Sequence, residues 1–142
     1  MVAEKDARLA GYILWEDHDA FEDYVGPMYY KQEENGDVRC AFVTQGKHMN
    51  GQNGLHGGML MTFADYALFI FADKVLGDQR AVTVSFNSDF TAGVGEGEFV
   101  ESTGEIVHET PGMLFLRGTI FCGDTVLLSY SAVLKKVRPK DK

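Results

Sequence analysis

Apolar residues from Met59 to Ala72 fall on every side of a helical wheel. A helix that is apolar all round is buried either in protein or in a membrane. The run is shorter than the roughly 20 residues that a bilayer requires, and the charged Asp65 lies near its middle. The pattern therefore predicts a long helix over 57–76 that is enclosed by protein.

After Gly77-Asp78 the hydrophobic period changes to two, which is typical of strands. In the first of these strands Val82, Val84, Phe86 and Phe90 alternate with polar residues. This alternation predicts that Thr83 and Ser85 share the polar face. Turns at Pro111-Gly112 and Gly123-Asp124 then separate three more predicted strands, over 99–109, 113–122 and 125–137.

The first part of the chain shows shorter patterns. A short helix is predicted over 17–25, where Asp17 or Asp19 can cap its start and Gly26-Pro27 ends it. The Asn35-Gly36 pair is a strong hairpin signal, because both central turn positions require positive φ. It joins two predicted strands, over 28–33 and 37–44, and a Gly- and Asn-rich loop follows over 45–55.

Together these elements predict one α+β domain. The order is two strands, one long apolar helix and a meander of four strands, so a curved antiparallel sheet wrapped around the helix would bury most of it. A second subunit would cover the remainder. We divide the chain into an N-terminal extension with a short helix (1–27), the main domain (28–137) and a basic tail (138–142).

Composition and net charge exclude some classes of function. The chain has 142 residues, enough for one core, and its formal net charge is −8. That charge argues against binding nucleic acid or anionic membranes. Cys40 and Cys122 lie in apolar strand-like runs without metal-ligand spacing, so we expect both to be reduced and buried. No secretory pattern opens the chain, and we predict a cytoplasmic location.

The charge distribution is uneven at the C-terminal end. Five basic residues crowd the last eight positions, with Asp141 as the one acid among them. This segment is either a solvated terminus or a cationic rim for a phosphate-bearing substrate arm. The basic residues are Lys135, Lys136, Arg138, Lys140 and Lys142.

The first candidate for chemistry is His56-Gly57-Gly58, at the start of the long helix. The first N–H groups of a helix have no internal partner and carry the positive end of its dipole. The Gly57 N–H can thus stabilise a developing oxyanion, and His56 can donate to or orient a carbonyl. The alternative is that the glycines merely allow tight packing and that His56 caps the junction.

Asp65 is the second candidate. A carboxylate in apolar surroundings is costly unless it is paired, and desolvation raises the pKa of such a group, which is one route to a general base. The alternative is a structural Asp bonded to an amide or hydroxyl. Thr83 or Ser85 can hold Asp65 or a water molecule, although such hydroxyls are also common on half-exposed strands.

Helix geometry constrains how these candidates cooperate. Asp65 lies about 12 Å along the helix from Gly57, at 1.5 Å per residue. One carbonyl cannot reach both groups of the same chain. If both act on one thioester, they belong to two subunits whose helices run antiparallel, and the site lies at a dimer interface.

The segment from Asn50 to Asp65, read as N-x₅-H-G-G-x₆-D, resembles the hotdog-fold acyl-CoA thioesterases of the phenylacetate-pathway type, in the 4-hydroxybenzoyl-CoA thioesterase superfamily. The similarity covers residues 28 to 137 and includes Ala81-Val82-Thr83-Val84. It implies a hotdog fold, an acyl-CoA substrate, no cofactor or metal, and a homodimer that pairs into a homotetramer.

The resemblance also implies individual roles. Asp65 would be the general base or nucleophile, Gly57 the oxyanion amide, and Asn50 the group that positions water. His56 would hold the thioester carbonyl or the loop, and Thr83 would support the carboxylate or the water. We place Gly58 and Ser85 with Thr83 as substrate-binding candidates.

Two other functions stay open. The same fold also carries hydration or dehydration of enoyl or hydroxyacyl thioesters, although the His-Gly-Gly spacing suits hydrolysis better. A non-catalytic acyl-CoA-binding module is the other alternative, and its expected mark would be loss of Asp65 or Asn50, both of which are present.

Overall fold

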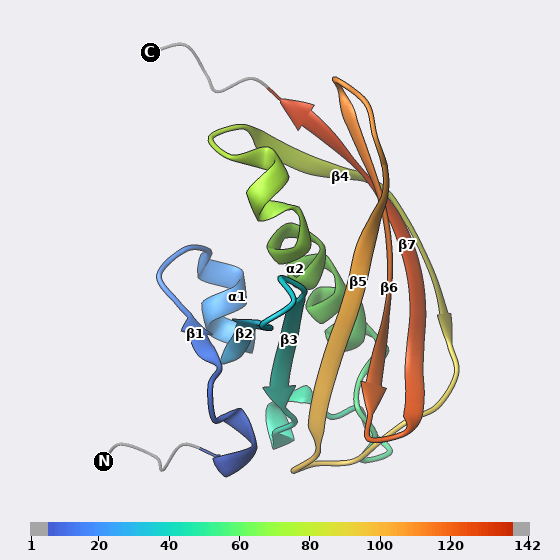
Figure 1. Cartoon of the computed structure of the whole chain (residues 1–142). Helices are drawn as coiled ribbons and strands as arrows, with labels where there is room; N and C mark the ends of the chain where they lie inside the picture. Colours follow the sequence, from blue (N-terminus) through green and yellow to red (C-terminus); the bar gives the residue numbers. More distant parts are fainter. Residues whose placement is uncertain (1–5, 138–142) are drawn as a thin grey trace.

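A seven-stranded antiparallel sheet curves around one long helix in the computed structural model, which describes residues 6–137 (Figure 1). The strand order is β1-β2-β3-β5-β6-β7-β4. The predicted arrangement of a sheet wrapped around a helix is confirmed. The elements are η1 (Ala7–Leu9), β1 (Ile13–Trp15), α1 (Ala20–Val25), β2 (Met28–Gln32), β3 (Val38–Val43), η2 (Gly46–His48), α2 (Gly57–Leu76), β4 (Arg80–Phe90), β5 (Phe99–Glu109), β6 (Met113–Cys122) and β7 (Thr125–Val137).

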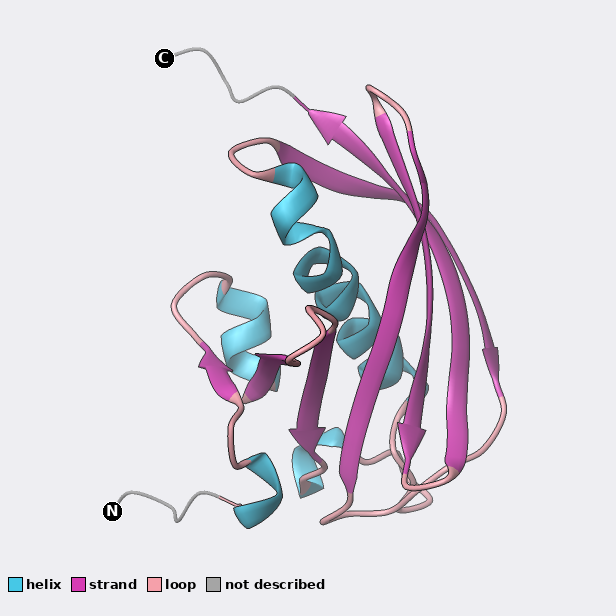
Figure 2. Cartoon of the chain, in the orientation of Figure 1, coloured by secondary structure: helices cyan, strands magenta, loops and turns pink. Residues whose placement is uncertain are grey.

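Helix α2 has the predicted bounds and lies in the concave side of the sheet, as Figure 2 shows. Phe63, Ala64, Ala67 and Leu68 are completely buried, as expected for a helix without a polar stripe. Gly77 ends the helix with φ of 56°, and its N–H donates to the Asp73 carbonyl.

Two neighbouring glycines of the sheet make room for aromatic rings, one from α2 and one from β7. Gly104 of β5 pairs with Gly118 of β6. A Cβ at Gly104 would lie 2.6 Å from the Phe71 ring of α2 and 2.7 Å from the Arg117 carbonyl oxygen. A Cβ at Gly118 would lie 2.6 Å from the Tyr130 ring. The sheet therefore has room for two aromatic rings only because these side chains are missing.

The N-terminal extension is joined to the sheet. Helix α1 lies within the predicted range, and Asp19 caps it by accepting a hydrogen bond from the Glu22 N–H at 3.0 Å. The sequence did not predict β1, which pairs with β2 at the sheet edge. On the apolar side of α1, Phe21 and Tyr24 are 60% and 81% exposed, whereas Val25 packs against the core.

Strand β4 departs from the predicted alternation. The register with β7 shifts between Thr83, opposite Leu134, and Ser85, opposite Val133. This β-bulge leaves Val84 without a partner and reverses the facing of the residues that follow. Thr83 and Phe86 thus face α2, whereas Val82 and Val84 are 46% and 51% exposed. The prediction that Thr83 and Ser85 share a face is wrong.

The remaining predictions have mixed outcomes. Both cysteines are free; Cys40 is buried as predicted, but Cys122 is half-buried. Within the predicted basic segment, Lys136 forms an ion pair with Glu109, and the tail over 138–142 lies outside the described residues. No helix within residues 6–137 is both long and apolar enough to cross a membrane.

Candidate active site

Two cavities lie beside α2, and α1 contributes to both. The Asp65 cavity, of about 390 Å³, is lined by Trp15, His18 and Glu22 of the extension and by Asp65 and Tyr66 of α2, among others. It is the more polar of the two. Because it lies against the middle and C-terminal half of α2, it does not include the glycines at the helix start.

Asp65 is half-buried and oriented by one neighbour. The Thr83 hydroxyl of β4 donates to Asp65 Oδ1 at 2.7 Å. Within residues 6–137, no group donates a hydrogen bond to Oδ2. The predicted hydroxyl partner is therefore Thr83, and the carboxylate keeps one oxygen open toward a proton donor from outside the chain, such as water. This arrangement suits a general base.

The second cavity, which we call the His56 cavity, has a volume of about 410 Å³. Its walls are mainly apolar, and it adjoins the start of α2. Lys47 and His48 of η2 add polar groups to its lining. The other lining residues are Phe21, Tyr24, Val25, Met49, His56, Gly58, Met59 and Thr62.

His56 caps α2, which was one of the two readings of the sequence. Its Nδ1 accepts a hydrogen bond from the Gly58 N–H at 2.8 Å. The Gly58 amide is thus occupied, and Gly58 contributes only cavity wall. In the neutral ring, Nε2 then carries the proton and can donate to a ligand.

The Gly57 amide is different, because as the first residue of α2 it has no intrahelical acceptor. No acceptor for it is found elsewhere in residues 6–137. A Cβ at this position would lie 3.0 Å from the Phe90 ring, so glycine also keeps the approach open. An unpaired N–H at a helix start can donate to an oxyanion, and this role of Gly57 stays a prediction.

Asn50 lies in the loop before α2, outside the lining of both cavities. Its Oδ1 accepts hydrogen bonds from the Gln52 and Gly54 N–H groups at 2.9 and 3.0 Å. The observed contacts therefore build the loop. The proposed positioning of water by Asn50 stays a prediction.

Ser85 is exposed and lies beyond the bulge, on the face of β4 opposite to Thr83. The structure does not bring it to Asp65. The predicted substrate contact of Ser85 has no support within one chain. Of the two hydroxyls weighed in the sequence, Thr83 is the one that the bulge directs toward α2.

Sequence reasoning missed three residues of the extension. Trp15 Nε1 donates to Glu22 Oε1 at 3.0 Å, and the His18 ring stacks on Trp15 with centroids 3.9 Å apart. Burial raises the pKa of Glu22 to about 7 against the opposing Trp15 hydrogen bond, and the charges of Asp19 and Asp65 add to the rise. No sequence pattern marked Glu22, since it sits in an ordinary first helical turn.

His48 joins η2 to the end of α1, and both elements line the His56 cavity. Its Nδ1 accepts from the Gln45 N–H, so its Nε2 donates to the Val25 carbonyl at the end of α1. Burial lowers the pKa of this ring, which favours the neutral form that the two contacts require. We interpret His48 as structural.

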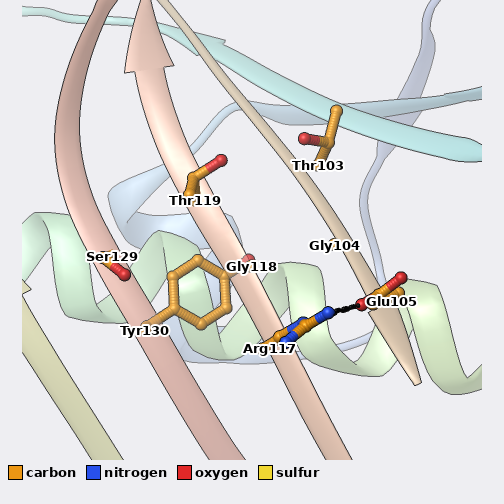
Figure 3. Close-up of a pocket in the computed structure, with 8 residues that line it drawn as sticks. All are labelled: Thr103, Gly104, Glu105, Arg117, Gly118, Thr119, Ser129 and Tyr130. Atoms are coloured by element: carbon orange, nitrogen blue, oxygen red, sulfur yellow. Dashed lines mark hydrogen bonds and ion pairs between the residues drawn. The ribbon is translucent and has the colours of Figure 1, made fainter. Parts of the chain in front are cut away.

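A third hollow, of about 360 Å³, lies on the outer face of the sheet, with α2 behind the strands (Figure 3). Arg117 and Glu105 form an ion pair across it. It contains none of the candidate residues. Among the described residues, no group of three or more His, Cys, Asp or Glu side chains is arranged to hold a metal ion.

Comparison with known proteins identifies the family. The sequence model of the family described as "Thioesterase superfamily" matches residues 52–129, which is more than half of the chain and includes α2 and Asp65. The chain belongs to the thioesterase superfamily. The Pseudomonas aeruginosa protein named "Putative esterase PA0474" is 28% identical to this chain over 112 residues. The aligned part covers 78% of this chain and 84% of that protein.

Solved structures show the same fold. The BH2602 protein from Bacillus halodurans, crystallised with CoA, has a TM-score of 0.79 at 19% identity, covering 88% of this chain and 83% of its own. A variant of the phenylacetic acid degradation protein PaaI from Thermus thermophilus has a TM-score of 0.72 at 22% identity, covering 84% and 100%. The predicted hotdog fold and the predicted thioesterase superfamily are confirmed, and PaaI shares the fold.

Proposed function

We propose that this chain hydrolyses an acyl-CoA thioester to a free acid and a thiol. Asp65 Oδ2 accepts a proton from water as the water oxygen attacks the thioester carbonyl. The Gly57 N–H donates to the oxyanion that forms, at the positive end of the α2 dipole. The observation that carries the proposal is the Asp65 carboxylate, held at Oδ1 by Thr83 and open at Oδ2, in a cavity of a thioesterase-superfamily chain.

We further propose that each site is shared between two copies of the chain. Asp65 and the start of α2 belong to different cavities of one chain, and about 12 Å of helix axis separates Asp65 from Gly57. Strand β4 is an edge strand with exposed Val82 and Val84. Pairing of two β4 edges would set two α2 helices antiparallel and align one copy's Asp65 with the other's Gly57. Assembly into a homodimer, and a homotetramer beyond it, stays a prediction.

The thiol carrier is inferred from chemistry and from a relative. BH2602, which shares the fold, was crystallised with CoA. The apolar walls of the His56 cavity suit an acyl chain, and Lys47 adds a positive charge to that lining. The net charge of −8 requires such local cations if a polyanionic coenzyme is to bind.

The decisive experiment is Asp65→Asn, assayed by thiol release from acetyl-, hexanoyl-, palmitoyl- and phenylacetyl-CoA. The amide cannot accept the water proton, so we expect turnover to fall by about 10²–10⁴-fold with unchanged fold and assembly. Asp78→Asn, which removes the same charge from the turn after α2, is the control and should keep wild-type turnover. Full activity of the Asp65 variant would exclude Asp65 from the mechanism.

A hydratase is the second candidate, because Glu22 gives the Asp65 cavity an additional acid. Crotonyl-CoA separates the two reactions. Hydrolysis releases a free thiol, whereas hydration removes the enoyl absorbance without thiol release. Binding of CoA esters without either change would instead indicate a non-catalytic module.

A further inference from the structure

Glu22 is the feature of the Asp65 cavity that the reaction described so far does not use. It belongs to α1 of the extension, whereas Asp65 belongs to α2, and both carboxyl groups line the same cavity. Glu22 Oε1 accepts the hydrogen bond from Trp15 Nε1. Within residues 6–137 nothing donates to Glu22 Oε2. The carboxyl is therefore oriented at one oxygen and available at the other, as Asp65 is.

The support of Glu22 is built from aromatic contacts. Trp15 is fixed between the stacked His18 ring and the edge of Tyr66, whose centroid lies 5.8 Å away. Tyr66 is 1% exposed, and its hydroxyl has no hydrogen-bond partner among the described residues. A buried hydroxyl without a partner is costly. Tyr66 also lines the cavity, so the aromatic support of Trp15 forms part of its wall.

The charges around Glu22 favour its protonated form. Asp19 and Asp23 lie on its own element, and Asp65 and Asp73 face the cavity from α2. Among the described lining residues of the cavity, His18 is the one side chain with a basic nitrogen, and neither Lys nor Arg is present. Glu22 takes part in no ion pair within residues 6–137. With a pKa of about 7, it carries a proton over much of the neutral range and can give it up there.

We propose that Glu22 is a second catalytic carboxyl group, which protonates the leaving sulfur. This inference rests on the proposed thioester hydrolysis. Water loses a proton to Asp65 and adds to the carbonyl carbon; the oxyanion then collapses and the C–S bond breaks. The sulfur takes the Glu22 proton, so the products are the acid and the neutral thiol. Asp65 returns its proton to Glu22 across the shared cavity, and the cycle closes without another reactant.

The test compares two leaving groups in Glu22→Gln. An alkanethiol such as coenzyme A leaves less readily than an aryl thiol of lower pKa, so acid assistance matters more for the acyl-CoA. We expect kcat/KM to fall about a hundredfold for acyl-CoA but less than about threefold for the aryl thioester of the same acid. Glu16→Gln, which removes an exposed charge from the same extension, is the control and should change neither rate.

The pH profile gives a second readout. In the wild type, kcat/KM for acyl-CoA should decline above about pH 7 as Glu22 loses its proton, and Glu22→Gln should lack this decline. Equal losses on both thioesters, or an unchanged profile, would mean that Glu22 is merely structural and would overturn the inference. If the wild type hydrolyses neither thioester, or if Asp65→Asn remains active, the proposed hydrolysis itself is wrong.

Discussion

The Asp65 cavity and the His56 cavity lie beside the same helix but differ in chemistry. The first is lined by the carboxyl groups of Asp19, Glu22, Asp65 and Asp73, whereas the second is lined mainly by apolar side chains and adjoins the positive end of the α2 dipole. Hydrolysis of a thioester needs a base, an oxyanion donor and an apolar wall together. One chain holds these parts in two separate places. The difference therefore favours a reaction that becomes possible only where two chains meet.

Removing the Gly57 N–H should give the largest effect on the reaction that the two cavities would share. Proline removes the N–H while suiting the first position of a helix, and the extended backbone of His56 is compatible with a following proline. We expect Gly57→Pro to lower kcat by about 10²–10³-fold, because one oxyanion donor is lost. Gly57→Ala adds a Cβ near Phe90 but keeps the N–H, so it should retain much more activity in the same thiol-release assay.

Mixing Gly57→Pro with Asp65→Asn after joint refolding then tests the shared site. In a mixed dimer, one site combines the intact Asp65 of one copy with the intact Gly57 of the other. Random pairing should restore about a quarter of wild-type activity, if the shared-site geometry holds. No recovery, with mixed dimers shown to form, would place both groups in one chain and remove the contrast between the cavities.

A smaller effect is expected at Thr83, which orients the base of the Asp65 cavity. Thr83→Val removes the hydrogen bond to Oδ1 and should lower kcat about tenfold, in keeping with the loss of one charge-assisted bond. Thr83→Ser keeps the hydroxyl and should stay near the wild type. If valine and serine behave alike under steady-state conditions, the hydroxyl contact does not matter for catalysis.

The smallest effect concerns stability. The folded pKa of Glu22, about 7, lies above its ordinary value of 4.5, so the folded state binds more protons between these pH values. Stability from this group is present below about pH 4.5 and is lost as the pH rises through 7. Because Glu22 is partly exposed, Glu22→Gln should gain only about 1 kcal/mol at pH 8 and nothing at pH 4. Urea unfolding at both pH values measures this difference, and an equal gain at both would contradict it.

Much of the fold could be predicted from the sequence because its strongest signals are local. The long apolar run around Asp65 predicted α2, and the turn pairs divided the meander. Asp17 and Asp19 both marked the start of α1, and the structure shows that Asp19 is the cap. Strand β1 was missed because three residues carry no measurable period. The bulge after Thr83 was missed because it depends on the pairing of β4 with β7, which no alternation within one strand reveals.

The residues of the candidate site also differ in how far the sequence could predict them. Asp65, Gly57 and Thr83 could be located because they follow one another along a helix and the next strand. The sequence left open whether His56 is a cap, and the Gly58 contact shows that it is one. Glu22 was invisible, since its position beside Asp65 results from the tertiary packing of α1 on α2. Residues brought from a distant element need coordinates.

The pair formed by Gly104 and Gly118 limits which substitutions the sheet can accept. These residues have no chemistry of their own, yet the nearest atoms to a methyl at Gly104 include a fixed carbonyl oxygen as well as the Phe71 ring. Such a methyl would push α2 away from the sheet. Asp65 and the Gly57 N–H both belong to α2 and would move with it. A substitution on the concave face of the sheet can thus change the reaction rate, although the substituted residue never contacts the substrate.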